Sequence, residues 1–555
     1  MRSFAAFLAI PLLTLLPLRA QLPSASEVQE RRLPNGIRLL LVERPGLPAF
    51  HATLAFRGGW AEEPASLPGA TELLAHALYG AAWPEDVGEP SSGTQALEAL
   101  LKQEDGLAES LRLARLVPNG GGAAQATELE ASLQTLQARV AALRDTAPLA
   151  DLYARLGGHQ SASATADALL VNTELPVTGF DLWCHAETTR LERLEMSRFF
   201  EARTALLDRL RARQDPGPAL LRGAAFPGHP YGRNLADHRA GIEALRWSDL
   251  RDYASRACSP ERLTLILVGG VSLDTALPLL SRTLGALPTP ALREEPIFPD
   301  LPKDLGDRQI QATLGAAPRL LVGWRIPPRN QPDHLALAMA AHLLGGERTG
   351  RLTLQLVDRK HLAQRVAVHL DQPGGRHGGL LTVEMQPAEG HSLPELEAAL
   401  HSEILRFQQE AIAPDAWQRA LAELDLDHLQ AEDAPGRLAR ALGLAWTETG
   451  DWHAFYTEPQ RLEQLTPEAV QAAVQTWLTP SHRTTALIEP ALLEQDPLDA
   501  ETIRTLQALA ARRIEDPGQR ERLVAEGLRQ LRMLPPEERR RTLKLLLAQL
   551  PPERP

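Results

Sequence analysis

The chain has 555 residues, of which 44% are apolar and 23% are charged, and its formal net charge at pH 7 is −12. This length predicts more than one domain and a substantial buried core, and the composition is that of an ordinary globular protein. The negative charge excludes a general nucleic-acid binder, because such a protein presents a basic surface.

Residues 1–20 form a segment of their own. Arg2 precedes an apolar run over residues 4–18, and Ala20 offers a small residue for cleavage before Gln21. This pattern predicts a secretory signal peptide, and the alternatives are an uncleaved anchor or a buried N-terminal helix. No later apolar run is long enough to cross a bilayer, so we expect a periplasmic or secreted protein with no stable membrane span.

Two strands and a helix come next. The turn at Asn35-Gly36 leads into an apolar strand that ends near Val42, and a second strand covers residues 50–59. The stretch Gly69-Ala-Thr-Glu-Leu-Leu-Ala-His-Ala-Leu-Tyr-Gly80 then has the layout of the zinc-binding helical motif H-x-x-E-H. In that motif both histidines project from one helical face onto the metal, and the glutamate is the general base.

The chemical positions of this motif are largely replaced. The first ligand position is Glu72, the general-base position is Ala75, and the second histidine is kept as His76. An alanine side chain has no atom that can accept a proton. We therefore expect no catalytic residue in this helix.

Further segments support a resemblance to a known family. They are Gly157-Gly-His-Gln-Ser-Ala-Ser-Ala-Thr-Ala-Asp167, the helical stretch from Glu201 to Asp208, Asp215-Pro216, His229-Pro-Tyr-Gly232 and the apolar strand from Leu265 to Gly270. With the strands and the motif helix, this order resembles the pitrilysin/insulinase family of zinc peptidases, the inverzincins. The resemblance implies an α+β fold of two tandem related α/β-sandwich domains of the mitochondrial processing peptidase-like type, which face each other across a substrate chamber.

Alternating strand and helix patterns in both halves also predict two α+β domains of similar plan. The predicted parts are an N-terminal peptidase-like domain at residues 28–287, a Pro-rich linker at 288–318, a C-terminal peptidase-like domain at 319–490 and a helical tail at 491–555. Within the first domain, residues 84–150 form an insert. Its Ala/Leu/Glu-rich stretches at 96–116 and 124–143 predict a helical hairpin. We assign no function to the tail.

The resemblance implies a set of metal positions. Glu72, His76 and Asp208 stand where the family has its three zinc ligands, and Asp208 is one methylene shorter than the family's glutamate. A Glu/His/Asp set is not the His/His/Glu set that the family uses for zinc. We expect no cofactor, and any zinc that binds to these vestigial positions should bind weakly.

The resemblance also implies three substrate-binding positions. Ser161 takes the place of an asparagine in the Gly157 segment, Arg351 matches a family arginine, and Gln364 stands where the family has a tyrosine. The departures at residues 72, 75, 208 and 364 all fall at chemical positions, while the scaffold segments match. This distribution is typical of a homologue that keeps the fold and has lost the reaction.

We therefore interpret the chain as a non-catalytic homologue of a zinc metallopeptidase. It would act as a partner subunit or peptide-binding scaffold, in a heterodimer with a catalytically intact member of the family, and its ligands would be peptides or unfolded polypeptides. Two alternatives stay open. One is an active metal-dependent endopeptidase that uses the Glu/His/Asp set, and the other is a structural or assembly protein with a vestigial chamber.

The two cysteines leave a further choice open. Cys184 lies beside Trp183 in an apolar stretch, and Cys258 just precedes a strand. They could form one disulfide in an exported protein or remain buried free thiols. Neither has the neighbours of a catalytic nucleophile.

Overall fold

The structure is a computed structural model. It describes residues 25–80, 92–117, 122–142, 148–193, 198–212, 215–289, 306–314, 317–346 and 349–490, with 497–513 and shorter stretches up to residue 548. The predicted signal peptide lies outside these residues. Two compact units are distinguished by their contacts: residues 1–312 with 318–488, and residues 313–317 with 489–555. Each is described by itself.

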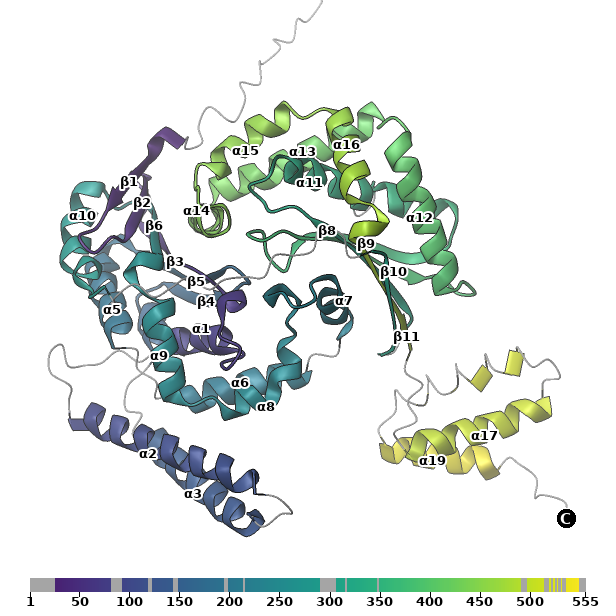
Figure 1. Cartoon of the computed structure of the whole chain (residues 1–555), viewed down its shortest axis with the longest axis horizontal. Helices are drawn as coiled ribbons and strands as arrows, with labels where there is room; N and C mark the ends of the chain where they lie inside the picture. Colours follow the sequence, from purple (N-terminus) through teal and green to yellow (C-terminus); the bar gives the residue numbers. More distant parts are fainter. Residues whose placement is uncertain are drawn as a thin grey trace, which may run out of the picture. The chain divides into compact units, whose positions relative to one another are not determined.

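The first half of the large unit contains a six-stranded sheet with the strand order β1-β2-β6-β3-β5-β4 (Figure 1). The strands are β1 (Val28–Arg32), β2 (Arg38–Glu43), β3 (Ala49–Arg57), β4 (His159–Ala164), β5 (Ala168–Pro176) and β6 (Leu263–Gly269). Strands β2 and β6 pair in parallel, and the other pairs are antiparallel. Because β4 is an edge strand, one row of its backbone groups has no partner within the sheet.

Helices of the same half cover one face of this sheet. They are α1 (Ala70–Gly80), α4 (Leu149–Arg155), α5 (Phe180–Glu192), α6 (Phe199–Ala212), α8 (Arg239–Ala244), α9 (Trp247–Ala257) and α10 (Leu273–Arg282). Leu39 and Leu265 face these helices, whereas the neighbouring Leu40 and Ile266 face the opposite side. The central strands are therefore apolar on both faces, as expected for strands covered on both sides.

The insert is a hairpin of α2 (Ser92–Arg115) and α3 (Ala123–Ala142), as the sequence predicts. The two helices contact each other along their length (Figure 1). Leu111, Ala114, Ala126 and Leu133 form a small core between them. At the base of the hairpin, Leu101 and Val140 join the main core of the first half.

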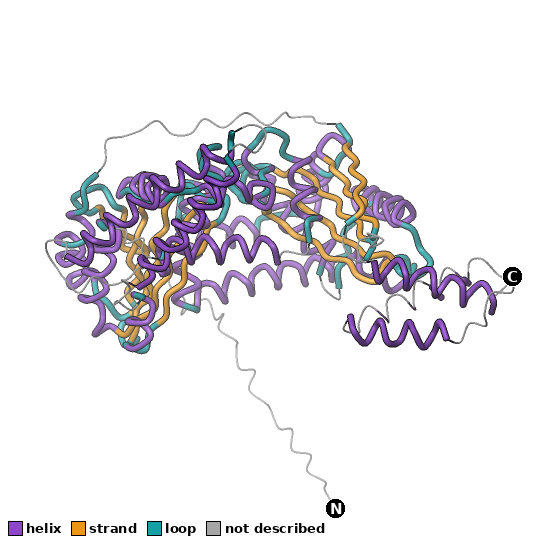
Figure 2. The backbone as a smooth tube through the Cα atoms, turned by 90° about the horizontal axis from the view of Figure 1, so that it is seen from below, coloured by secondary structure: helices purple, strands orange, loops and turns teal. Residues whose placement is uncertain are grey.

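The second half contains a five-stranded sheet with the order β7-β11-β8-β10-β9. The strands are β7 (Arg308–Thr313), β8 (Arg319–Ile326), β9 (Ala363–Gln372), β10 (Gly379–Pro387) and β11 (Arg483–Glu489). The helices are α11 (Pro332–Gly345), α12 (Leu393–Gln409), α13 (Pro414–Asp433), α14 (Pro435–Thr449), α15 (Ala454–Glu463) and α16 (Pro467–Trp477), with a π-helical segment over Thr353–Arg359. Figure 2 shows the strands of the two sheets as separate groups with helices beside each.

Strand β7 differs from the sequence analysis, which places residues 308–313 in a linker. Its residues alternate between half-buried and exposed positions, and only isoleucine among them is a large apolar residue. A short, polar edge strand has a weak hydrophobic signal, and the preceding prolines favour a linker. The strand forms because β11 offers it a partner.

The two halves exchange helices across their junction. Helix α14, from the second half, packs on β3, β5 and β6 of the first sheet, and α7 (Gly217–Ala225), from the first half, packs on β8 of the second. Leu438 and Leu442 of α14 are fully buried in a core formed with Ile266 and Val268. Each such leucine stabilises the packing by about 1.5–3 kcal/mol, so the two halves are held as one body by apolar burial.

The small unit contains α17 (Pro497–Arg513) and α19 (Pro536–Ala548). Leu506, Leu531 and Leu543 form its apolar cluster. The helical tail is therefore present, as predicted from the Ala/Leu/Arg-rich pattern. Among the described residues of both units, no helix has the length and apolarity needed to span a membrane.

Candidate functional site

A cavity of about 510 Å³ lies between α1, α6 and the edge strand β4. Its lining is made by Glu72, Ala75, His76 and Tyr79 of α1, by Arg209 of α6, and by all six residues of β4, His159 to Ala164. The cavity thus contains the degenerate motif helix on one side and an unpaired strand edge on the other.

The position of α1 is fixed by a buried carboxylate and by its apolar face. Glu63 accepts hydrogen bonds from the backbone N–H groups of Gly69 at 2.8 Å and Thr71 at 2.7 Å, which satisfies donors that the first turn of a helix leaves free. Burial raises the pKa of Glu63, while these hydrogen bonds oppose the rise. Leu73 and Leu74 are buried in the core, so the opposite side of the helix faces the cavity.

Glu72 and His76 lie one turn apart on the cavity side of α1, as their spacing predicts. Glu72 Oε2 accepts a hydrogen bond from Arg209 Nη2 at 2.8 Å. Burial lowers the pKa of His76, the positive charge of Arg209 lowers it further, and Glu72 acts in the opposite direction. The imidazole is therefore uncharged at neutral pH, and its neighbour in the cavity is a guanidinium.

Asp208 is not brought to this cavity. Its carboxylate is bonded to Arg211 on the same helix at 2.8 Å, its side chain is 61% exposed, and it does not line the described cavity. Adjacent residues of a helix point about 100° apart, so the helix that was expected to supply Asp208 supplies Arg209 instead. The sequence analysis missed Arg209. Its positive charge beside a ligand position was the available signal.

These residues do not fit a zinc ion. In the described part of the chain, no group of three or more His, Cys, Asp or Glu side chains is arranged to hold a metal. Glu72 is already paired with a guanidinium, and a divalent cation would have to displace that positive charge. Ala75, at the general-base position, contributes only a methyl group to the lining. No proton-transfer step can be derived from this arrangement.

Strand β4 offers small side chains and a buried amide. Ser161, Ala162, Ser163 and Ala164 leave space along the strand edge, and Ser161 Oγ accepts a hydrogen bond from Asn172 at 3.5 Å. Gln160 is 2% exposed; its Nε2 donates to Glu187 at 3.4 Å, and its Oε1 has no hydrogen-bond partner within the described structure. The expected substrate position Ser161 therefore lies in the cavity wall.

The other two expected substrate positions lie elsewhere. Arg351 bonds to Glu403 and Glu410, and Gln364 is an exposed residue of β9; neither lines the described cavity. Glu403 is fully buried. Burial acts to raise its pKa, but a hydrogen bond from Lys360 and the charges of Lys360, Arg351 and Arg406 bring the pKa below its ordinary value. Arg351 is thus engaged in a structural ion cluster of the second half.

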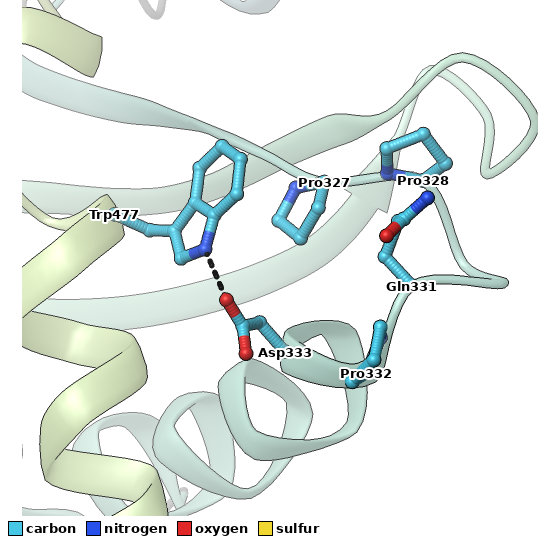
Figure 3. Close-up of a pocket in the computed structure, with 6 residues that line it drawn as sticks. All are labelled: Pro327, Pro328, Gln331, Pro332, Asp333 and Trp477. Carbon is cyan, nitrogen blue, oxygen red and sulfur yellow. Dashed lines mark hydrogen bonds between the residues drawn. The ribbon is translucent and has the colours of Figure 1, made fainter.

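A second hollow of about 350 Å³ lies in the second half and is lined by Pro327, Pro328, Gln331, Pro332, Asp333 and Trp477 (Figure 3). The indole N–H of Trp477 donates to Asp333 Oδ2 at 2.9 Å, as the dashed line shows. The one donor of the tryptophan is therefore already used. A wall of prolines around this pair offers no acid–base chemistry.

The cysteines are free thiols. Cys184 is buried and Cys258 is partly buried, and they do not form a disulfide. Burial raises the pKa of both, that of Cys258 to about 12. Because the thiolate is the reactive form, neither cysteine is a nucleophile at neutral pH.

Comparisons with known proteins agree with this architecture. Residues 246–424 match the family model described as Peptidase M16 inactive domain. The chain is 24% identical over 232 residues to the zinc protease PqqE of Helicobacter pylori, a match that covers 39% of this chain and 51% of that protein. The matched region and these relatives support the resemblance of the chain to the pitrilysin/insulinase family, M16.

Solved structures of M16-like peptidases share the fold. A protease from Helicobacter pylori superposes with a TM-score of 0.66 at 15% identity, covering 84% of this chain and 100% of the other. The periplasmic protease PqqL from Escherichia coli superposes with a TM-score of 0.60 at 13% identity, covering 91% of this chain and 50% of the other. At such identities the likeness concerns the fold, and the predicted α+β fold of two M16-type sandwich domains is confirmed.

Proposed function

We propose that this M16 homologue is a non-catalytic protein that binds extended peptides along the edge of β4. The observation that carries the proposal is the pair Arg209–Glu72 in the cavity, beside Ala75. An ion pair replaces the cation site, and a methyl group replaces the general base. What remains is a strand edge next to an open cavity, and such an edge binds an extended peptide through main-chain hydrogen bonds.

The cavity is suited to a peptide for a second reason. All six residues of β4 line it, so a ligand can follow the strand over its length. The small side chains from Ser161 to Ala164 leave room for the side chains of an added strand. This arrangement supports a peptide-binding scaffold over a vestigial chamber without a ligand.

The loss of metal chemistry can be tested directly. Elemental analysis of the purified chain should find far less than one zinc ion per chain, and the chain should not cleave an unstructured peptide. A positive control is the combined variant Glu72→His, Ala75→Glu and Arg209→Glu, which puts the third ligand at the position of α6 that lines the cavity. This variant restores the ligand types and removes the competing guanidinium, so it should bind zinc measurably by titration calorimetry. Stoichiometric zinc in the unmodified chain, with cleavage that a chelator abolishes, would overturn the proposal.

We propose further that the chain acts as a partner subunit of a catalytically intact M16 peptidase in the periplasm or outside the cell. A scaffold that holds a peptide without cutting it needs a second protein to complete a reaction. The charged and apolar run at the N-terminus of the sequence and the periplasmic relative PqqL support this location. The complex should bury more than about 1,000 Å², and the partner's peptide cleavage should depend on this chain. An intact relative that is fully active alone and never co-purifies contradicts this role.

A further inference from the structure

Arg209 has donor capacity that its ion pair does not use. Its Nη2 donates a hydrogen bond to Glu72, and among the described residues the guanidinium has no other acceptor. Half of the side-chain surface of Arg209 is exposed. A guanidinium has five N–H donors in a fork that matches a carboxylate through two parallel bonds. Arg203, which precedes it on α6, instead donates to the backbone carbonyls of Glu243 and Leu245. Arg209 therefore presents free donors to the cavity.

The charge balance of the cavity permits a second carboxylate. Among the described lining residues, Glu72 is the sole carboxylate and Arg209 the sole permanent cation, and His76 and His159 can only add positive charge. Ala75 removes the acidic group that the motif would place there, and Asp208 is paired outside the cavity with Arg211. An incoming carboxylate beside Arg209 thus meets one negative group in the described lining, whereas a glutamate at position 75 and an inward carboxylate at position 208 would have added two more.

We infer that Arg209 binds a carboxylate of the peptide that pairs with β4. The ligand class is then an extended peptide with an Asp or Glu side chain, or with a free C-terminal carboxylate, at this position. The inference rests on the proposed function, because it needs a peptide on the β4 edge. It adds to that function a selectivity that the guanidinium imposes.

The test is a set of four fluorescent peptides that share one unstructured sequence. They combine an internal Glu or Gln with a free or amidated C-terminus, and their affinities for the purified chain are measured by fluorescence polarisation. We expect one of the two replacements to weaken binding roughly tenfold, the loss typical of a charge-assisted bond. If replacing the internal Glu by Gln weakens binding, the carboxylate is that of a side chain. If amidation of the C-terminus weakens binding, the carboxylate is that of the C-terminus.

Three variants assign the effect to Arg209. Arg209→Ala should reduce affinity for the carboxylate peptide about tenfold and leave that for the neutral peptide unchanged. Arg211→Ala, two residues along the same helix and outside the cavity lining, is the matched control and should change neither. Glu72→Gln removes the competing carboxylate and should strengthen binding of the acidic peptide about threefold or more. A gain of affinity cannot result from damage to the fold.

The outcomes separate the inference from the proposed function. If all four peptides bind equally and Arg209→Ala changes nothing, the peptide-binding function stands and the carboxylate inference fails. If no peptide of the set binds, both fail. If Glu72→Gln weakens binding of the acidic peptide, then Glu72 contacts the peptide itself, and the assignment of Arg209 as the receptor of the carboxylate is overturned.

Discussion

The carboxylate of Asp167, in the first half of the chain, accepts a hydrogen bond from the backbone N–H of Gly375, in the second half, over 3.0 Å. The same carboxylate accepts from the N–H of Arg376 at 3.1 Å and from the hydroxyl of Tyr231 at 2.5 Å. Asp167 is 3% exposed. The aspartate and tyrosine of two sequence motifs thus meet at the junction of the halves, where they hold a loop of the second domain.

Removing this carboxylate should destabilise the junction. Asp167→Ala leaves the buried N–H of Gly375, the half-buried N–H of Arg376 and the Tyr231 hydroxyl without their acceptor, so we expect the free energy of unfolding to fall by about 2–4 kcal/mol. Urea unfolding followed by circular dichroism measures this change. Asp252→Ala, at an exposed position of α9, is the control and should stay within about 0.5 kcal/mol of the unmodified chain. Equal stability of the two variants would contradict a role for Asp167 in joining the halves.

The exchanged helix α14 gives a second prediction. A Cβ atom at Gly443 would lie 3.1 Å from Ala55 Cβ and 3.3 Å from Ile266 Cδ1, so a larger side chain cannot fit without moving the helix off the sheet. Gly443→Leu should lower the free energy of unfolding by about 1–3 kcal/mol through overpacking. Arg437→Leu adds the same side chain at an exposed position of the same helix and should have little effect. Similar losses in both would show that leucine itself, and not the close contact, is responsible.

Much of the fold could be predicted because the spacing of apolar residues along the sequence indicates the strands and helices. The runs that became β6 and β8 are buried on both faces, and the hairpin stretches repeat at helical spacing. The exchange of α7 and α14 could not be predicted, since a helical pattern shows that a face is apolar and not which sheet it covers. Strand β7 was missed for a related reason: its polar residues form a strand only beside β11.

The candidate site was predicted in part. Spacing alone placed Glu72 and His76 on one face of a helix, and both line the cavity. The family resemblance pointed to Asp208 and Arg351. In this chain, however, Asp208 is paired with Arg211, and Arg351 is paired with the buried Glu403. Such ion pairs depend on which charged side chains are close in the folded structure, and a sequence motif does not contain this information. Arg209 was missed because it replaces no recognised position.

The last prediction concerns pH. His229 is buried, and its Nδ1 accepts a hydrogen bond from the backbone N–H of Tyr231 at 3.1 Å. Because Nδ1 is the acceptor, this contact favours the neutral imidazole over the charged one. Burial, with a smaller contribution from His377 (ring centroids 5.5 Å apart), lowers the pKa of His229 to about 4. An unfolded histidine titrates near 6.5. Between these values the unfolded state binds more protons than the folded state, so stability falls as pH is lowered.

We expect the free energy of unfolding to decrease by about 1–2 kcal/mol through His229 between pH 7 and pH 5. His229→Asn keeps a side-chain acceptor for the Tyr231 N–H and removes the titrating group, so its loss of stability over the same interval should be smaller by this amount. Burial also lowers the pKa of His377, which leaves part of the dependence in place. His185→Asn, at an exposed position of α5, is the control. If urea unfolding shows the same loss of stability between pH 7 and pH 5 for His229→Asn as for the unmodified chain, then the protonation of His229 is not the cause of this pH dependence.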